Sequence, residues 1–186
     1  MKIYINDIQY DATEKETIIQ VADRNNIHIP RFCYHKHLSV VASCRMCLVD
    51  IDKVKQAQPA CSTLVFEEMR IYTKSQKTKE AQKSTMEFLL INHPLDCPIC
   101  DQAGECELQD VSLQHGDSKS HYMQFKRVVI DEEISPLIST EMTRCIHCSR
   151  CVRFGEEIAK EKELGLLNRG EKMEIRSAIT NGVHSE

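Results

Sequence analysis

The sequence predicts an α+β protein built from several small units that metal sites hold together. Two observations carry this prediction: short strands of alternating residues precede polar helix-forming runs, and ten cysteines fall into three separate groups. Aromatic residues make up only 5% of the 186 residues and Trp is absent, so one large apolar core is not expected. Small domains with thin cores are commonly stapled by metals. The length suits either one ordinary domain or a few small ones.

The sequence of residues 1–72 predicts a compact α+β unit. Two short strands, Lys2–Ile5 and Ile8–Asp11, flank an Asn-Asp pair that suits a hairpin turn. Thr17 can cap a short helix with apolar residues on one face, and Asn26 can adopt the left-handed conformation that ends it. Further strands are expected at 47–51 and 69–73, and the long stretch 29–46 between the helix and these strands is expected to be a functional loop.

After residue 73 the sequence becomes polar and favours helix. A run of Lys, Gln and Thr leads into a helix that should end at Asn92 or His93, because the residue before a proline avoids the helical region. His93 is therefore expected at a helix end, over the cysteines that follow it. Shorter helices are expected at 105–115 and 154–162, and short strands at 128–130 and 173–175.

Charge, hydropathy and the N-terminus argue against several classes of protein. The formal net charge of −4 gives no basic footprint, so a nucleic-acid partner is not expected. No apolar run approaches the roughly 20 residues that span a bilayer, so no direct membrane insertion is expected. Met1 leads directly into an alternating segment without a signal or transit peptide, so the protein is expected to stay in the compartment where it is made.

The ten cysteines favour metal binding over disulfides. In a reducing cytosol structural disulfides are rare, and clustered cysteines bind metal or do redox work. The even number leaves a disulfide scaffold as an alternative. The chain shows no secretion signal, however, and it repeats a C-x2-C spacing, which argues for metal sites.

The first group has the spacing C-x10-C-x2-C-x13-C. Two close cysteines can grip a metal cluster from a tight loop, and two distant ones complete the site. This spacing is a relative of the plant-type [2Fe–2S] pattern, with a longer first gap. Four thiolates also make a structural zinc site, although zinc ligands usually come as two short pairs and only one short pair is present here. The residues are Cys33, Cys44, Cys47 and Cys61.

The second group combines a histidine with three cysteines in the order H-x3-C-x2-C-x5-C. Imidazole is neutral whereas thiolate is anionic, so a His ligand raises the reduction potential of an iron–sulfur cluster. Two alternatives remain at this point: the histidine is a bystander near the cysteines, or the group binds zinc. The residues are His93, Cys97, Cys100 and Cys106.

The third group, Cys145, Cys148 and Cys151, has the C-x2-C-x2-C spacing of a [4Fe–4S] site. Gly155 stands where bacterial ferredoxins continue with a fourth cysteine. The three groups together use all ten cysteines, so none is left to complete this cluster. The histidines at 147 and 184 are candidate ligands, although surface or structural roles are commoner for such residues.

Long motifs around these groups resemble the N-terminal part of the large iron–sulfur subunit, the G subunit, of NADH-quinone oxidoreductase, the respiratory complex I. The resemblance covers the whole chain. The motifs are I-P-R-F-C-Y-H at 29–35, C-R-M-C-L-V at 44–49, M-E-F-L-L-I-N-H-P-L-D-C-P-I-C-D-Q at 86–102, G-E-C-E-L-Q-D at 104–110, P-L-I-S-T-E-M-T-R-C-I-H-C at 136–148 and C-V-R-F at 151–154.

The resemblance implies a fold, domains and cofactors. It implies a ferredoxin-like β-grasp [2Fe–2S] domain at 1–76, followed by small, mostly helical and loop-rich iron–sulfur domains. These are a His-plus-three-Cys [4Fe–4S] domain at 77–120 and an incomplete [4Fe–4S] domain of the molybdopterin-oxidoreductase type at 121–186. The first and second groups would each ligate a cluster, and the third would supply three ligands to another. The cofactors are thus one [2Fe–2S] cluster and one or two [4Fe–4S] clusters.

The chain departs from the family pattern in a few places. Ala42, Glu68 and Asn168 stand where relatives often have Gly, and Leu64 where many have Pro. Gly supplies positive φ, so each exchange is expected to cost stability. The family places the missing fourth ligand in a later L-S-G…C-P-V-G segment, and the sequence ends at V-H-S-E. This predicts a fragment, a truncated product, or a last ligand from elsewhere.

The function that the resemblance implies is electron transfer within complex I. Electrons would come from the flavin- and NADH-binding subunit and pass towards the quinone-side hydrophilic subunits. The complex would sit peripherally on the cytoplasmic face of the bacterial inner membrane, or on the matrix side if organelle-encoded. No general base, nucleophile or nucleotide-binding loop is evident, so catalysis would belong to the assembly. Alternatives are the N-terminal module of an NAD-linked hydrogenase or formate dehydrogenase, and a zinc-stapled interaction module.

Overall fold

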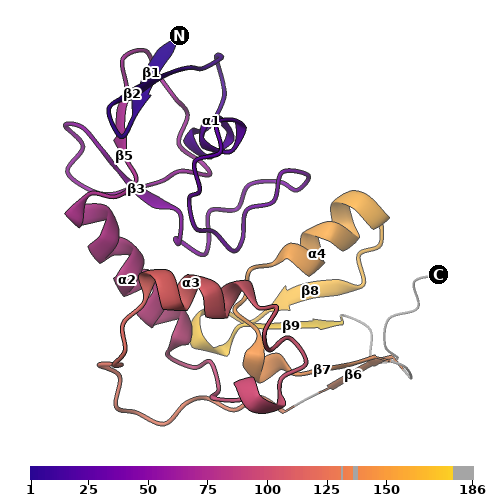
Figure 1. Ribbon diagram of the computed structural model, residues 1–186. Helices are drawn as coiled ribbons and strands as arrows, with labels where there is room; N and C mark the ends of the chain where they lie inside the picture. The colour runs from indigo at the N-terminus through magenta and orange to yellow at the C-terminus, as the bar shows by residue number, and fades with distance from the viewer. Residues whose placement is uncertain (131, 136–137, 178–186) are drawn as a thin grey trace.

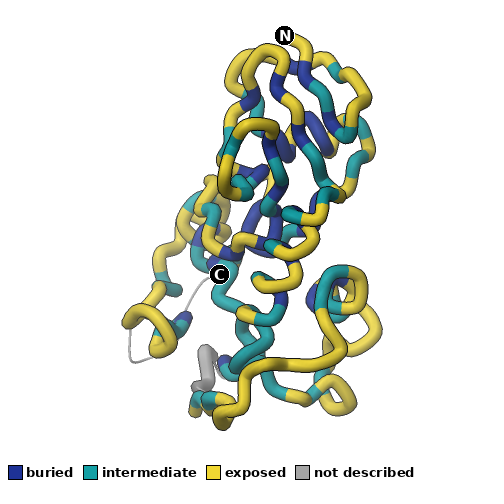
Figure 2. Tube along the Cα trace, turned by 90° about the vertical axis from the view of Figure 1, so that its left-hand side faces the viewer, coloured by how far each residue is buried: buried dark blue, intermediate teal, exposed yellow. Residues whose placement is uncertain are grey.

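The computed structural model describes residues 1–130, 132–135 and 138–177 of the chain. An N-terminal α+β unit is followed by a region of short helices, hairpins and long connections (Figure 1). Figure 2 shows that buried residues gather in the N-terminal unit and along its junction with the rest, while the later loops are largely exposed. No helix within the described residues is both long and apolar enough to cross a membrane.

The N-terminal unit is a mixed five-stranded sheet with the order β2-β1-β5-β3-β4. The two central strands β1 and β5 are parallel, and the other neighbours are antiparallel. Helix α1 (Ile18–Arg24) packs against this sheet, and its buried face joins the isoleucines of β1 in one core. This is the expected β-grasp arrangement. The strands are β1 (Lys2–Ile5), β2 (Ile8–Asp11), β3 (Leu48–Ile51), β4 (Gln58–Pro59) and β5 (Arg70–Tyr72).

Local signals in the N-terminal sequence are confirmed. Asn6 and Asp7 both have positive φ (51° and 66°), as the expected hairpin turn between β1 and β2 requires. Thr17 caps α1 in a capping box with Gln20, and Asn26 follows the helix with a φ of 57°. Strand β4 was not expected, because its two residues carry no alternating pattern.

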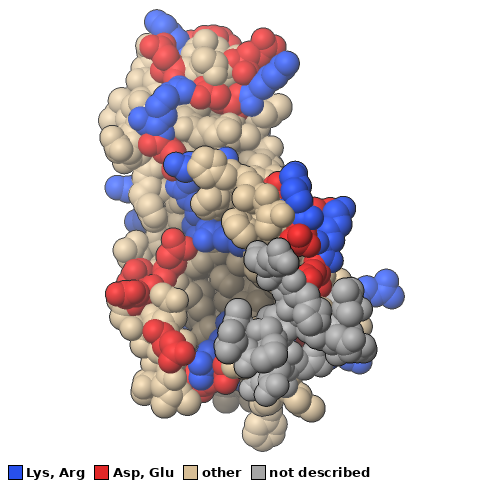
Figure 3. Space-filling view, turned by 90° about the vertical axis from the view of Figure 1, so that its right-hand side faces the viewer, with Lys and Arg blue, Asp and Glu red and all other residues tan. Residues whose placement is uncertain are grey.

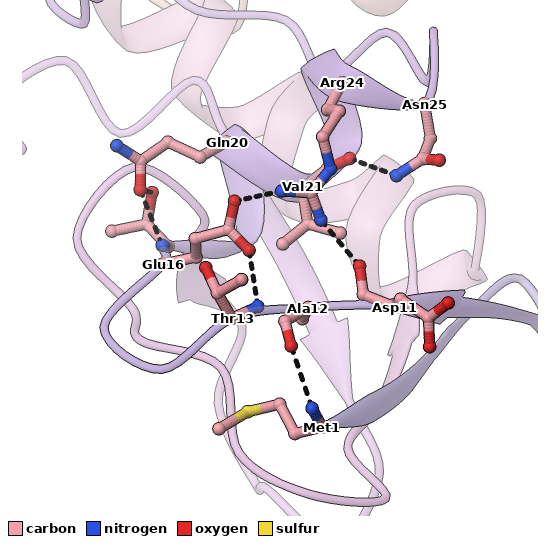
Figure 4. Close-up of polar contacts among 10 residues, drawn as sticks. Met1, Asp11, Ala12, Thr13, Glu16, Gln20, Val21, Arg24 and Asn25 are labelled. Carbon is pink, nitrogen blue, oxygen red and sulfur yellow. Dashed lines mark hydrogen bonds and ion pairs between the residues drawn. The ribbon is translucent and has the colours of Figure 1, made fainter.

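Polar contacts hold the connection between β2 and α1 in place (Figure 4). The Glu16 carboxylate accepts a hydrogen bond from the Thr13 backbone N–H at 2.7 Å and forms an ion pair with Arg24. Arg24 also donates to the backbone carbonyl of Asp11 at 2.6 Å, so the last turn of the helix is tied back to the end of β2.

Helix α2 (Gln76–Leu90) connects the sheet to the later region. Ser75 is its N-cap, and its side chain accepts from the Thr78 backbone N–H. The buried face packs on β3, where Gln82 donates to the carbonyl of Leu48 at 3.1 Å. The helix ends at Leu90, two to three residues before the expected end, and His93 N–H still bonds to the Leu90 carbonyl at 3.2 Å.

Thr78 joins α2 to the sheet, and its replacement by Val is expected to destabilise the protein by about 1–3 kcal/mol. The side chain is fully buried, donates to the Tyr72 carbonyl at 2.8 Å and accepts from the Asp50 N–H at 3.0 Å. Valine keeps the shape but leaves both backbone groups without this partner. Urea unfolding measures the effect. Thr85→Val is the matched control, because among the described residues that hydroxyl donates to the Ala81 carbonyl of its own helix and to no other group. Equal losses in both variants would contradict the prediction.

Within the described residues, the later region consists of helices of nine and five residues, two hairpins and several short turns. The expected helix at 105–115 is confirmed as α3, which packs against α2. The elements are η1 (Cys97–Ile99), α3 (Glu107–His115), β6 (Glu132–Ser135), β7 (Ile138–Thr140), η2 (Met142–Arg144), α4 (Arg150–Phe154), the π-helical turn η3 (Gly155–Ala159), β8 (Leu164–Leu167), η4 (Gly170–Lys172) and β9 (Glu174–Ser177).

Two expectations for the later region need correction, and a third is confirmed with a small shift. The strand at 128–130 is wrong: Val129 exchanges hydrogen bonds with the Thr143 hydroxyl instead of a neighbouring strand, and Val128 and Ile130 are exposed. The helix expected at 154–162 begins earlier, at Arg150, and ends in a π-helical turn at Ala159. The strand expected at 173–175 is confirmed as β9, one residue later, and its partner β8 was missed.

The three residues at glycine positions of the family all have left-handed backbones. The φ values are 51° at Ala42, 61° at Glu68 and 62° at Asn168. A residue with a Cβ loses about 1–2 kcal/mol in this region, and asparagine loses less than alanine or glutamate. The expected cost of the missing glycines therefore has a visible structural cause.

Ala42→Gly and Glu68→Gly are each expected to raise the free energy of unfolding by about 0.5–1 kcal/mol. Relief of the left-handed strain exceeds the extra freedom that glycine gains in the unfolded chain. Asn168→Gly is the matched control and should gain less, because asparagine tolerates this conformation. Thermal unfolding compares the three variants. A larger gain at Asn168 than at Ala42 would contradict the strain argument.

Candidate metal centres

The structure brings the four cysteines of the first group together in the interior. All four are buried, with exposed fractions of 7% or less. The thiol of Cys33 lies within hydrogen-bonding reach of Cys44 and Cys61, and that of Cys47 within reach of Cys61. The Cys33 backbone N–H also points at the Cys44 Sγ, 3.4 Å away. Such N–H donors stabilise sulfur ligands of a cluster.

The local backbone explains why these cysteines meet. Left-handed residues at Ala42 and Arg45 (φ 51° and 58°) fold the loop 29–46 tightly before β3. Cys47 stands immediately before β3, and its carbonyl accepts from the N–H of Ala60 at 3.0 Å. That bond places Cys61 beside Cys47, although 13 residues separate them.

The cysteines of the first group lie close enough to shift one another's pKa. Hydrogen bonds to Cys33 raise the pKa of Cys44 and, together with a bond to Cys47, that of Cys61. The same bonds lower the pKa of Cys33 and Cys47. The four sulfurs thus interact with one another in one buried place. Iron bound there would displace the remaining protons, because only thiolates are good ligands.

The second group surrounds an open cavity of about 720 Å³, with His93, Cys97, Cys100 and Cys106 on its wall. Cys97 is exposed, and Cys100 and Cys106 are half-buried. The cavity is thus less enclosed than the first site. Figure 3 shows that the molecule is hollowed below the N-terminal unit, where acidic and basic side chains are interspersed.

His93 fits the role of a ligand. Its Nδ1 atom is buried and lacks a hydrogen-bond partner in the described part of the chain. Burial lowers the pKa of the imidazole, and the charge of Lys126 lowers it further, so the ring is held in the neutral form that binds metal. The backbone of Arg144 lies within hydrogen-bonding reach of the ring and acts in the opposite direction. Such a partner orients a ligating histidine.

Local structure places the cysteines of the second group. Cys97 begins the short turn η1, and Cys106 is the N-cap of α3. Between them Gly104 has a φ of +86°, which only glycine adopts readily.

The third group occupies a turn that leads into α4. His147 and Ser149 both have left-handed backbones (φ 56° and 57°), and the His147 N–H points at the Cys145 Sγ, 3.4 Å away. Burial raises the pKa of the Cys145 and Cys151 thiols. The thiols of Cys148 and Cys151 lie close enough to Cys145 to raise its pKa further, so the turn brings the three cysteines near one another.

The structure shows the surroundings of His147, one of the two histidines considered as a fourth ligand of the third site. Burial lowers the pKa of His147, and its ring lies near Arg127 and within hydrogen-bonding reach of the Met173 backbone. Its Nε2 atom is buried and lacks a hydrogen-bond partner among the described residues, as His93 Nδ1 does, so a ligand role for His147 stays a prediction. His184 lies outside the described residues.

A second buried cluster touches cysteines from all three groups. Its members include Cys33 and Cys44 of the first group, with Cys106 of the second and Cys148 of the third packed against it. Apolar side chains from α2, α3 and the loop fill the space between them. These side chains are Phe32, Met46, Met86, Leu89, Leu90, Leu108, Val111 and Ile146.

Arginines of the third group's segment contact both other groups. Arg144 donates to Asp96, beside Cys97, at 3.3 Å. Arg150 donates to the Tyr34 carbonyl, beside Cys33, at 3.0 Å and pairs with Glu107, beside Cys106, at 3.5 Å. Arg153 likewise contacts the first group. Sequence spacing did not single out these arginines, although they stand inside the C-x2-C-x2-C motif and next to it.

Within the described residues, no three His, Cys, Asp or Glu side chains converge as a single-ion site. The ligands of an iron–sulfur cluster bind different irons and need not converge on one point. The donor sets fit such clusters: four buried cysteines, then an unpartnered imidazole with three cysteines, then three cysteines in one turn.

Three family models match consecutive parts of the chain. A 2Fe-2S iron-sulfur cluster binding domain matches residues 1–76. The NADH-ubiquinone oxidoreductase-G iron-sulfur binding region matches 82–121, and the ferredoxin-like domain of NADH-quinone oxidoreductase subunit 3 matches 135–186. The chain thus carries a [2Fe–2S] binding domain and [4Fe–4S] binding regions, which favours iron–sulfur over the zinc alternative.

A solved structure shares the fold. A crystal structure of an NAD+-reducing [NiFe]-hydrogenase in the H2-reduced state has a TM-score of 0.88, and the match covers 96% of this chain and 75% of that chain. The two sequences are 23% identical, so the likeness shows the fold alone.

Curated relatives agree with the family models. The NADH-ubiquinone oxidoreductase 75 kDa subunit of Reclinomonas americana is 43% identical over 186 residues, which is 100% of this chain and 27% of that protein. The G subunit of the NADH-quinone oxidoreductase of Rickettsia typhi is 44% identical over 186 residues, 100% of this chain and 28% of the relative. The chain thus spans little more than a quarter of the length of these relatives. By sequence over its whole length, it is similar to the iron–sulfur G subunit (75 kDa subunit) of NADH-quinone oxidoreductase.

Proposed function

We propose that this chain transfers electrons within an NADH-quinone oxidoreductase, from the flavin- and NADH-binding subunit towards the quinone-side hydrophilic subunits. The observation that carries the proposal is the buried cluster that touches cysteines of all three groups. When bound, iron–sulfur clusters supply one-electron transfer between fixed sites. The names of the relatives, which are subunits of such an oxidoreductase, support it.

The proposed ligands follow the three groups. The first group belongs to a domain at 1–76, the second to a domain at 77–120 and the third to a domain at 121–186. The third site takes three ligands from the ten cysteines, and its fourth ligand is not among them. The sets are Cys33, Cys44, Cys47 and Cys61 for [2Fe–2S], His93, Cys97, Cys100 and Cys106 for [4Fe–4S], and Cys145, Cys148 and Cys151 for a second [4Fe–4S] cluster.

The residues around each site shape its electron affinity. Burial of all four cysteines excludes water from the first site. A neutral His93 in the second site leaves one negative charge fewer than four thiolates would, which raises its reduction potential. The arginines at 144 and 150 tie the third segment to the other two. The third segment thus contacts residues beside both other sites, which supports a position of the third site between them, out of sequence order.

In this proposal catalysis belongs to the assembly. This chain provides electron transfer alone, while partner subunits oxidise NADH and reduce quinone. The complex would be peripheral on the cytoplasmic face of the bacterial inner membrane, or on the matrix side if organelle-encoded. The alternative of an NAD-linked hydrogenase module draws on the shared fold. Such modules usually carry two full C-x2-C-x2-C-x3-C motifs, and Gly155, which stands where the x3-C continuation would place cysteine, argues against this alternative together with the absence of further cysteines in the sequence.

Metal analysis together with electron paramagnetic resonance tests the proposal on anaerobically purified protein. About six irons per chain are expected if two clusters assemble and about ten if all three do, with matching acid-labile sulfide. Dithionite should develop distinct [2Fe–2S] and [4Fe–4S] signals. Stoichiometric zinc without a reducible signal would overturn the iron–sulfur function and favour the interaction module.

A further inference from the structure

Arg153 lies buried between the first and third cysteine groups. It stands in α4 and only 5% of its surface is exposed. One terminal nitrogen, Nη2, donates to the carbonyl of Cys33 at 2.5 Å and to that of Cys148 at 3.1 Å. Nη1 donates to the Ser39 carbonyl at 2.6 Å, and Nε donates to the Ser149 hydroxyl at 3.2 Å. A single guanidinium thus holds one proposed ligand residue from each of two sites.

The charge of Arg153 has no ion-pair partner among the described residues. All four hydrogen-bond acceptors are neutral oxygens. Glu157, one turn further along, is the nearby acid, but its carboxylate accepts from the N–H of Ser39 at 2.8 Å and from the Ser39 hydroxyl. A buried arginine is almost always paired, because an isolated buried charge is strongly unfavourable. The arrangement therefore calls for negative charge beside the guanidinium.

Thiolate-held clusters would supply that negative charge. The two carbonyls that Arg153 binds belong to Cys33 and Cys148, whose sulfurs would carry the clusters. Each site becomes more negative by one charge when it takes up one electron. A fixed positive charge in a poorly solvated place favours the reduced form, because the Coulomb interaction is weakly screened there. The field of Arg153 would act on both sites together.

We propose that Arg153 is a positioning residue that raises the reduction potentials of the first and third sites together and fixes their ligand loops relative to each other. The proposal rests on the electron-transfer function above and names a determinant that sequence spacing alone does not reveal. The arginine beside the second site differs from Arg153 because its charge is paired. Arg144, its neighbour, forms ion pairs with both Asp96 and Glu141, so its charge is offset.

A redox titration of cluster-loaded protein, monitored by electron paramagnetic resonance, tests the proposal. All variants are made in the protein as its gene encodes it. Arg153→Gln keeps hydrogen-bond donors at this position but removes the positive charge. Arg153→Lys keeps the positive charge but loses the planar set of guanidinium N–H donors. The Gln variant is expected to lower the potentials of the first and third sites by at least about 59 mV, a tenfold change for one electron. The Lys variant should change the reduction equilibrium of either site less than about twofold.

Arg24→Gln is the matched control. It removes the same charge from an arginine that also contacts a backbone carbonyl, but Arg24 is 46% exposed and paired with Glu16. All three potentials should stay unchanged in it. A merely structural role would make Arg153→Lys as harmful as Arg153→Gln, and this result would overturn the proposal. A shift of the second site as large as the others would also overturn it.

Two further outcomes are decisive. If Arg153→Gln does not retain its clusters, Glu157→Gln takes its place, and loss of this negative charge should raise the first and third potentials. Unchanged potentials in Glu157→Gln would then contradict the proposal. If the unmodified protein binds no iron–sulfur clusters at all, the proposed function fails, and that result is distinct from clusters that assemble with potentials insensitive to position 153.

Discussion

Cys47→Ser is expected to abolish the [2Fe–2S] signal and to leave the [4Fe–4S] signals in place. Cys47 is 1% exposed, and its thiol lies beside that of Cys61 in the interior. A serine hydroxyl stays protonated there and is a poor ligand for iron. Loss of an outer-shell partner alone costs about 10–100-fold in metal affinity, so loss of a ligand should cost more. Iron content should fall by about two atoms per chain.

Ser62→Ala is the control for this prediction. Ser62 adjoins Cys61 in sequence but is exposed, so its loss should leave all signals unchanged. Electron paramagnetic resonance and iron analysis compare the two variants with the unmodified protein. A [2Fe–2S] signal that survives in Cys47→Ser would contradict the first ligand set. Loss of every signal would instead show that the three sites do not assemble independently.

His93→Cys is expected to keep the second cluster, a [4Fe–4S] cluster, and to lower its reduction potential, on the order of 100 mV. Thiolate brings a negative charge that neutral imidazole lacks, and the added charge disfavours the reduced form. His93→Ala removes the donor and should lose the cluster. The same spectroscopic titration measures both outcomes, because the potentials of the first and third sites serve as internal references.

His121→Gln is the matched control for the second site. His121 is exposed and pairs with Glu87 at 2.9 Å, and it does not itself line the cavity of the second group. Its replacement should leave the potential unchanged. A second cluster that assembles with an unaltered potential in His93→Ala would show that His93 is a bystander, the alternative that spacing alone left open.

Structural features that depend on residues close together in the sequence could be predicted from the sequence. The turn at Asn6 and Asp7 and the cap at Thr17 follow from local backbone preferences, and the structure has them. Helix α2 ends at Leu90, two to three residues before the end that was expected ahead of Pro94. The grouping of the cysteines by spacing also predicted which four meet in the first site. Ala42 and Glu68, which stand where relatives often have glycine, both have positive φ, the conformation in which a residue with a Cβ is strained.

Features that depend on distant contacts could not be predicted. Residues 128–130 have the composition of a strand, but Thr143 supplies their hydrogen bonds from another segment. Spacing gives ligand sets but not the order of the sites in space, because that order follows from how α2, α3 and α4 pack. The bridging role of Arg153 needs the fold as well, since its acceptor Cys33 lies 120 residues away.

The central claim is that the third site lies between the first and second. Pulsed electron paramagnetic resonance measures it directly, because a nearby reduced cluster speeds the spin relaxation of its neighbour and the effect falls steeply with distance. We expect the third signal to shorten the relaxation of both others. We expect the first and second signals to affect each other less. Stronger coupling between the first and second sites than between either and the third would contradict this arrangement.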